Sequence, residues 1–161
     1  MDNILKYFAG EKMQCTIGVI FSVLFIAASV YFLFQDKPFF KGAAYVSLPL
    51  AFFLLIICIA VLVRTPKDIE RVTTSYEQSP DKLQSEELAR MEKVMYSFGI
   101  IKKVELGILI LGIVLAIVFW RNPLWQGVGV GLIIQGIGLY LFDHFAELRG
   151  EEYISFLQSM G

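Results

Sequence analysis

The side chains of this sequence that could do chemistry gather where its apolar runs meet its polar segments. Seven of them form a mixed-charge group, here called the rim cluster: Arg64, Lys102, Glu105, Asp143, His144, Glu147 and Arg149. Carboxylates beside a histidine can bind a metal ion or relay protons, and His144 is the natural titrating member. Acids and bases near a membrane surface can also neutralise one another without any chemistry. We expect this second, structural role, with no catalytic residue and no bound metal.

One strongly polar side chain, Gln135, lies near the middle of an apolar run. An unpaired amide is costly in lipid, so this side chain should face protein and bond another helix or a second copy of itself. Contact with a transported substrate is the functional alternative. Cys15 and Cys58 also fall in apolar runs, and they lack the CxxC spacing of a zinc or redox site.

Glycines are frequent in residues 124–142, and glycine-rich segments can bind dinucleotides. That function needs a preceding strand and a soluble crevice, whereas small residues inside an apolar helix let a second helix approach closely. The sequence therefore predicts helix packing and no cofactor. The small residues expected to form this packing surface are Gly112, Ala116, Gly127, Gly131 and Gly136.

These residues lie in or beside long apolar runs. Hydrophobic residues make up 57% of the 161 residues, and they occur in blocks of membrane-spanning length. About 20 helical residues cross a hydrocarbon core of ~30 Å, so each block fits one crossing. Short links containing Pro38 and Pro123 join the blocks in pairs. We therefore predict an all-α integral membrane protein with four transmembrane helices, arranged as two antiparallel hairpins. The blocks cover residues 13–34, 43–63, 104–120 and 124–142.

Ser79, Pro80 and Asp81 are typical of a helix start in the polar segment between the two hairpins. No helix breaker follows before Asn122, so the third helix should extend ~30 Å out of the membrane. The predicted parts of the chain are a first hairpin with a short amphipathic lead (1–63), a cytoplasmic helical linker (64–103), a second hairpin (104–142) and an amphipathic tail near the membrane surface (143–161).

The extended part of the third helix carries apolar residues at three- and four-residue spacing, which indicates one hydrophobic face. This interaction stripe consists of Leu88, Met91, Met95 and Phe98. Water would surround the stripe unless another surface covers it. Three surfaces are available: a second copy of the chain, a separate protein, or the segment of the same chain that contains Ile69, Val72 and Tyr76.

An offset of 85 residues relates the two hairpins. Both contain a span, an aromatic-flanked proline turn, a glycine that begins the return span and an arginine where that span ends. Since both hairpins enter the membrane from the same side, duplication would give parallel repeats about an axis along the membrane normal. Two unrelated hairpins that share a proline turn are the alternative. The offset places Phe34 on Phe119, Pro38 on Pro123, Gly42 on Gly127 and Arg64 on Arg149.

The distribution of basic residues predicts the orientation. Eleven of the fourteen Lys and Arg residues lie in the amino-terminal lead, the linker and the tail, and three lie in the two short links. Because Lys and Arg favour the cytoplasmic side, both termini should be cytoplasmic, in a plasma membrane or bacterial inner membrane. The net charge of −1 gives no support for nucleic-acid binding.

These features favour a non-enzymatic integral membrane module that acts through protein–protein interaction, as a scaffold, regulator or assembly component. Its expected partners are the lipid bilayer and either another protein or further copies of the chain. The alternative is a small oligomeric transporter or channel, although coupled transporters usually keep a charged residue at mid-membrane depth and this sequence has none. A membrane enzyme that uses Glu105, Asp143 and His144 is the third hypothesis.

Overall fold

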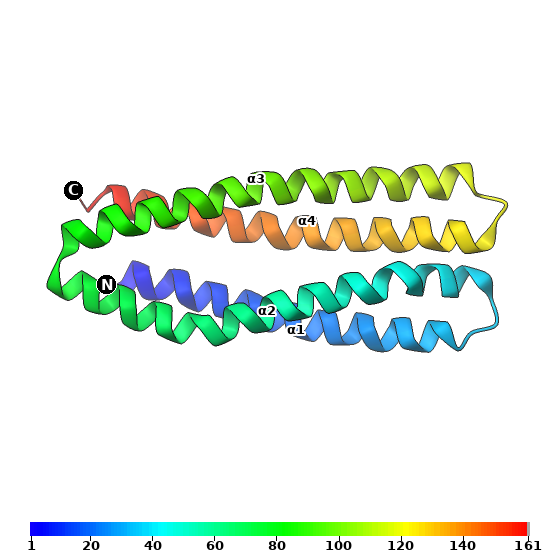
Figure 1. Ribbon diagram of the computed structural model, residues 1–161, viewed down its shortest axis with the longest axis horizontal. Helices are drawn as coiled ribbons and strands as arrows, with labels where there is room; N and C mark the ends of the chain where they lie inside the picture. Colours follow the sequence, from blue (N-terminus) through cyan, green and yellow to red (C-terminus); the bar gives the residue numbers. More distant parts are fainter. Residues whose placement is uncertain (161) are drawn as a thin grey trace.

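The computed structural model describes residues 1–160, which form four long α-helices and no strand. All four helices run along one long axis, with both termini and the α2–α3 connection at one end and the two short links at the other (Figure 1). The predicted all-α fold is therefore confirmed. The helices are α1 (Asp2–Leu33), α2 (Pro38–Gln78), α3 (Pro80–Val118) and α4 (Pro123–Gln158).

The helices pack in two pairs that meet through their inner members. α1 lies along α2, α3 lies along α4, and the pairs join mainly through α2 and α4. The contacts of α1 with α4, and of α2 with α3, are more limited. α1 and α3 therefore occupy outer positions, and each leaves a seam beside the inner helix of the opposite pair.

Local sequence signals set where the chain turns. Proline begins three of the helices, at Pro38, Pro80 and Pro123, where its missing N–H removes no helical hydrogen bond. Before α4 the Asn122 side chain also accepts a 3.2 Å hydrogen bond from the backbone N–H of Leu124. These caps separate helices that would otherwise continue into one another.

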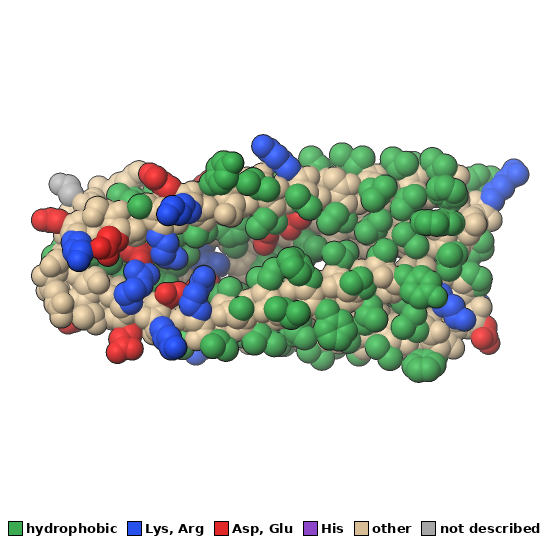
Figure 2. Space-filling model, viewed as in Figure 1, with side chains coloured by type: hydrophobic (Ala, Val, Ile, Leu, Met, Phe, Trp, Pro, Cys, Tyr) green, Lys and Arg blue, Asp and Glu red, His purple; other side chains and the backbone are tan. Residues whose placement is uncertain are grey.

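Three helices, α1, α2 and α4, are long and apolar enough to cross a membrane. The apolar part of α3 is shorter, because Lys102, Lys103 and Glu105 precede it. Figure 2 shows Lys, Arg, Asp and Glu side chains gathered over the end that holds the termini, which we call the polar end. Hydrophobic side chains cover most of the remaining length, here called the apolar section, and a few charged side chains return at the tip with the short links (Figure 2).

Within the predicted helical linker 64–103, the extension of the third helix from Pro80 onward is not the only helix. α2 does not end near Arg64 but continues through Pro66 to Gln78, and the chain reverses at Ser79. Pro66 removes one backbone donor, yet the turns that follow it are packed into the molecule and keep their helical conformation. α2 and α3 therefore share the extension between them.

The predicted amphipathic tail 143–161 is for the most part the continuation of the fourth helix, because α4 runs without a break from the apolar section to Gln158. At the other terminus α1 begins at Asp2, so the predicted amphipathic lead is the first part of the same helix as the span. All four helices extend into the polar end. They form a second section of the bundle there.

The polar end has its own hydrophobic core, built from all four helices. Tyr7 of α1 stacks on Tyr153 of α4, with ring centroids 4.3 Å apart. Complete burial of a large apolar side chain stabilises a fold by roughly 1.5–3 kcal/mol, so a core of this size holds the helix ends together. Its buried members are Ile4, Tyr7, Phe8, Val72, Leu83, Met91, Tyr153 and Leu157.

This core covers the interaction stripe, which is therefore not an exposed surface. Met91 is 0% exposed, and Leu88 packs against the same core. Met95 and Phe98 are half-buried. Of the three surfaces considered from the sequence, the chain itself supplies the cover, with Val72 of α2 among the covering residues. The interaction stripe is therefore not a continuous exposed face, because its Leu88 and Met91 pack inside the polar end and its Met95 and Phe98 are partly covered.

Candidate functional site

The structure divides the predicted rim cluster into two groups, and the first joins α3 to α4. Lys102 forms an ion pair with Glu147, and the same carboxylate lies 3.9 Å from Nδ1 of His144. Glu105 is 4% exposed beside Asp143, and its Oε2 has no hydrogen-bond partner among the described residues. No group of three or more His, Cys, Asp or Glu side chains within residues 1–160 could hold a metal ion. This group fastens α3 to α4 where the polar end begins.

The second group contains the two arginines, Arg64 and Arg149, which are 85 residues apart. Arg64 of α2 lies 2.9 Å from the carboxylate of Asp68 and 3.5 Å from that of Glu11. Arg149 of α4 instead donates a 2.6 Å hydrogen bond to the neutral amide oxygen of Gln14 on α1. In the part of the chain that the structure describes, no carboxylate forms an ion pair with Arg149. Arg64 is therefore paired with carboxylates, whereas Arg149 is bonded to a neutral amide.

Gln135 faces protein and not the outer surface of the bundle. It is 5% exposed, and its Nε2 lies 3.5 Å from the backbone oxygen of Ser47 on α2. On the same helix Gly127 and Gly131 also face α2. A methyl group added to Gly131 would lie 2.7 Å from the Val46 side chain, so the two helices are in close contact here.

The other predicted small residues lie between α3 and α4. A Cβ on Gly112 would lie 2.9 Å from the backbone oxygen of Gly129, and a Cβ on Gly129 would lie 2.5 Å from the backbone nitrogen of Ala116. Gly136 faces Leu109 at 3.3 Å. α4 thus uses glycines on two sides and packs against α2 and α3 at once.

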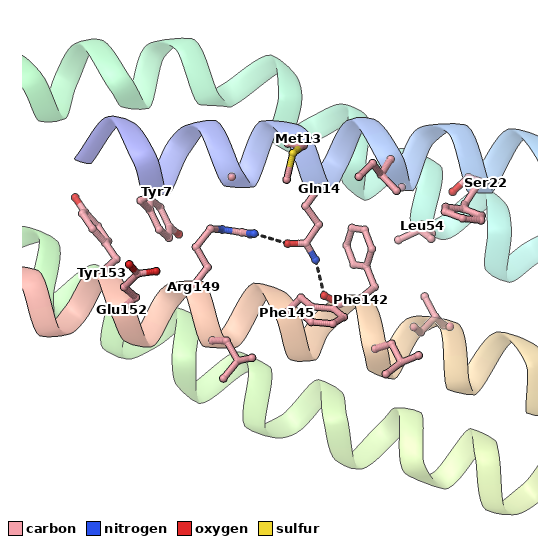
Figure 3. A pocket seen from close by; sticks show the side chains of 18 of the residues that line it. Tyr7, Met13, Gln14, Ser22, Leu54, Phe142, Phe145, Arg149, Glu152 and Tyr153 are labelled. Carbon is pink, nitrogen blue, oxygen red and sulfur yellow. Dashed lines mark hydrogen bonds between the residues drawn. The ribbon is translucent and has the colours of Figure 1, made fainter. Parts of the chain in front are cut away.

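A groove with a volume of about 970 Å³ runs between α1 and α4 (Figure 3). Side chains of α1 and α4 form its walls, and Ala51 and Leu54 of α2 also line it. Along α1 the lining extends from Asn3 to Phe25, which is about 33 Å at 1.5 Å per residue. Its main apolar lining residues are Ile17, Phe21, Phe25, Leu139, Phe142 and Phe145.

The groove changes character along its length. Its charged lining residues, Lys6, Arg149 and Glu152, all lie towards the polar end, and Lys6 forms an ion pair with Glu152. Beyond Gln14 the lining carries no charged side chain. Ser22 lies in that part, is 1% exposed, and its hydroxyl has no hydrogen-bond partner among the described residues. The groove therefore presents a cation where its apolar part begins.

Neutral groups hold the Arg149 side chain in place. Gly10 of α1 makes room for it, because a Cβ there would lie 2.7 Å from Cδ of Arg149. The guanidinium lies 6.0 Å from the centre of the Tyr7 ring, within the range of a cation–π contact. The Gln14 amide also donates a hydrogen bond to the backbone carbonyl of Phe142, so it is anchored on α4 as it accepts from Arg149 (Figure 3).

Two tyrosines line the polar end of the groove. Burial, reinforced by the charge of Glu11, raises the pKa of Tyr7 above its ordinary value of 10.0. Burial, reinforced by the charge of Glu87, raises the pKa of Tyr153 as well. Both phenols are therefore neutral hydrogen-bond donors at physiological pH, and the buried Oη of Tyr153 has no partner within the described residues.

Sequence reasoning places Arg149 in the rim cluster but misses Gln14 as its partner and misses the groove. The signal that could have found them is a four-residue repeat of small or polar residues along α1, at Gly10, Gln14, Gly18 and Ser22. This spacing places the four residues on one helix face, and all four line the groove. The opposite wall comes from a helix more than 100 residues later, which the spacing alone does not identify.

The candidate site thus consists of Arg149, the neutral groups that hold it and the apolar groove that begins beside it. Its residues come from α1, α2 and α4, which are the three helices apolar enough to cross a membrane. No protein-family model, curated protein or solved structure was found to match the chain.

Proposed function

We propose that the chain is a non-enzymatic, four-span integral membrane protein that binds a membrane amphiphile in the groove between α1 and α4. The observation that carries this proposal is the groove itself, whose volume of about 970 Å³ lies at the upper end of the ~300–1,000 Å³ typical of small-molecule sites. Its apolar part lies between helices that lipid would surround. An amphiphile can therefore enter it from the bilayer without crossing water.

That α3 also crosses the bilayer follows from its connections to α2 and α4. α3 leads from the polar end, where α2 finishes, to the tip where α4 begins (Figure 1). If α2 and α4 cross the bilayer, α3 must cross it too, which makes two antiparallel hairpins. Lys102 and Lys103 then lie near the headgroups, where long cationic side chains are favourable. The basic residues of the polar end make both termini cytoplasmic.

Mutual contacts between α2 and α4 support the duplication of one hairpin. A Cβ on Gly42 would lie 2.0 Å from the backbone oxygen of Leu124, and a Cβ on Gly127 would lie 1.9 Å from that of Phe39. The 85-residue offset relates Gly42 to Gly127 and Phe39 to Leu124. The two contacts are therefore equivalent, with the roles of the two hairpins exchanged. The two hairpins therefore meet through equivalent surfaces, as two subunits do about a two-fold axis.

The groove takes the place of the interaction stripe as the basis for function. With the stripe inside the polar end, a partner protein would have to recognise some other surface. Coupled transport is also less favoured, because the groove carries Ser22 and Gln135 in its apolar part and no charged side chain there. The uncharged hydrocarbon chain of an amphiphile fits the uncharged lining of this part of the groove.

A variant that fills the groove tests the proposal. Gly138 lines the groove, and a Cβ added there meets no atom within 4 Å, so Gly138→Leu occupies the cavity without pushing helices apart. Gly107 of α3 has the same open surroundings and does not line the groove, which makes Gly107→Leu the matched control. Native mass spectrometry of protein extracted in mild detergent should show fewer retained lipids for Gly138→Leu than for wild type or Gly107→Leu. Equal retention by all three proteins would refute the proposed function.

A further inference from the structure

Resting on the proposed function, we propose further that the amphiphile is an anionic phospholipid whose phosphate is bound by Arg149. Its acyl chain would lie in the apolar part of the groove, beyond Gln14. This assignment joins two features that the fold places side by side: a cation without a carboxylate partner, and the part of the groove beyond Gln14, whose lining carries no charged side chain.

Charge complementarity is the first argument. Arg64 and Arg149 occupy corresponding positions in the two hairpins, and both lie near the point where a helix leaves the apolar section. The fold supplies Asp68 and Glu11 to Arg64 but supplies only the neutral Gln14 to Arg149. The positive charge of Arg149 is therefore left for a ligand, whereas that of Arg64 is already neutralised.

The geometry of the guanidinium is the second argument. A guanidinium has five N–H donors in a planar fork that matches two phosphate oxygens, and the hydrogen bond from Nη1 to Gln14 uses one donor. Nε is buried and has no partner among the described residues. Gly10 and Tyr7 fix the side chain, so a phosphate would meet an arginine whose orientation is already set.

The level of Arg149 along the bundle is the third argument. Its partner Gln14 is the second residue of the first apolar run, 13–34, so the guanidinium lies where the headgroup layer meets the hydrocarbon. Basic pockets between transmembrane helices on the cytoplasmic side are a known way to hold anionic lipid headgroups. A phosphate at Arg149 would have its acyl chains directed along Ile17 and Phe21.

The headgroup should be anionic and not zwitterionic. A choline headgroup carries its own positive charge, which would compete with the guanidinium for the phosphate, and Lys6 at the same end of the groove is already paired with Glu152. A free phosphate would satisfy Arg149 but leave the apolar groove empty, so it should bind far more weakly. The proposal therefore ranks phosphatidylglycerol above phosphatidylcholine, and both above inorganic phosphate.

Lipid titration of the full-length protein tests this order. The protein is delipidated in a mild non-ionic detergent and titrated with phosphatidylglycerol, phosphatidylcholine or inorganic phosphate, and its melting temperature is followed. We expect the apparent affinity for phosphatidylglycerol to exceed that for phosphatidylcholine by about tenfold or more, the typical effect of a charge-assisted hydrogen bond. Inorganic phosphate alone should produce no shift at the same concentrations.

Arginine variants identify the group that recognises the headgroup. Arg149→Gln should lose the preference for phosphatidylglycerol while it keeps its affinity for phosphatidylcholine. Arg64→Gln is the matched control and should retain the wild-type preference. Arg149→Lys, which keeps the charge but not the fork, should retain part of the preference, and it serves as the test if Arg149→Gln does not fold.

The outcomes separate the two proposals. Equal affinity for both lipids, with both weakened by Gly138→Leu, would refute the anionic headgroup and leave the groove as a lipid site. Absence of any lipid effect, or binding that Gly138→Leu does not change, would refute the proposed function. A shift with inorganic phosphate equal to that with phosphatidylglycerol would show a free-anion site and overturn the assignment. Loss of the preference in Arg64→Gln to the same degree as in Arg149→Gln would exclude a specific role of Arg149.

Discussion

At the scale of single residues, the polar end is held by a buried acid between two bases. Glu87 of α3 is 0% exposed, and its carboxylate lies 2.7 Å from Arg71 of α2 and 2.8 Å from Arg90. Burial alone would lower the pKa of Arg90, but the hydrogen bond and the charge of Glu87 outweigh burial and raise it. Arg90 therefore stays charged, and Glu87 links α2 to α3 next to the hydrophobic core.

Removal of this acid should destabilise the protein. A buried ion pair that loses one partner typically costs 3–5 kcal/mol, but Arg71 and Arg90 reach solvent, so we expect about 2–3 kcal/mol for Glu87→Ala. The neighbouring Glu86 is exposed and lies 3.8 Å from Lys82, and Glu86→Ala should change stability by less than ~0.5 kcal/mol. Chemical denaturation followed by circular dichroism measures both, and equal effects would contradict a structural role of the buried triad.

At the scale of helices, the crossing of α2 and α4 depends on residues without side chains. Gly42 and Gly127 let the two backbones approach until an added methyl would lie about 2 Å from a carbonyl oxygen. The obstacle is backbone and not a movable side chain, so relief requires a shift of one whole helix. This crossing sets how far apart the two hairpins stand, and with that the width of the groove.

Gly127→Ala should therefore destabilise the protein, although alanine is the better helix former. Overpacking typically costs ~1–3 kcal/mol, and contact with backbone places this variant at the upper end of that range or above. Gly138 lies on the same helix with open space around it, so Gly138→Ala should be neutral or slightly stabilising. Thermal unfolding in detergent distinguishes them, and an unchanged melting temperature for Gly127→Ala would show that the helices are farther apart.

Much of the helical structure could be predicted from the sequence, because proline turns and long apolar runs are local signals. Pro80 begins a helix as expected, whereas Pro38 and Pro123, expected inside the short links, are the first residues of α2 and α4. The continuation of α2 through Pro66 could not be predicted, since a proline normally ends a helix and only the packing of later residues such as Val72 keeps this one intact.

The candidate site could be predicted only in part for a related reason. The spacing of Leu88 and Met91 shows that one helix face is apolar, but it does not show which surface covers that face. Likewise the charge of Arg149 is visible in the sequence, whereas its lack of a carboxylate partner depends on Gln14, 135 residues away. Contacts between distant residues decide the site, and periodicity along one helix does not contain them.

At the scale of the whole molecule, charged and hydrophobic surfaces are separated along the long axis (Figure 2). Each helix passes from the polar end into the apolar section without interruption. The polar end is thus continuous with the apolar section, and in the proposed membrane topology the whole polar end lies on one side of the bilayer.

Cysteine labelling of intact cells tests this orientation. In a background with Cys15→Ala and Cys58→Ala, the variants Asp36→Cys and Ser85→Cys each place one exposed thiol, at the tip and at the polar end. A membrane-impermeant maleimide added from outside should label Asp36→Cys and not Ser85→Cys until the cells are opened. The reverse pattern would place the polar end outside the cell.

The stack of Tyr7 on Tyr153 has a consequence for biosynthesis. The ribosome makes Ile4 and Phe8 early, but Tyr153 and Leu157, which share their core, emerge only after all four spans have been translated. In the proposed membrane topology the first hairpin is complete before the second is made, whereas the core of the polar end must wait for the final turns of α4. A chain that stops before Tyr153 therefore leaves the aromatic side chains of this core exposed to water, and we expect quality-control proteases to remove it.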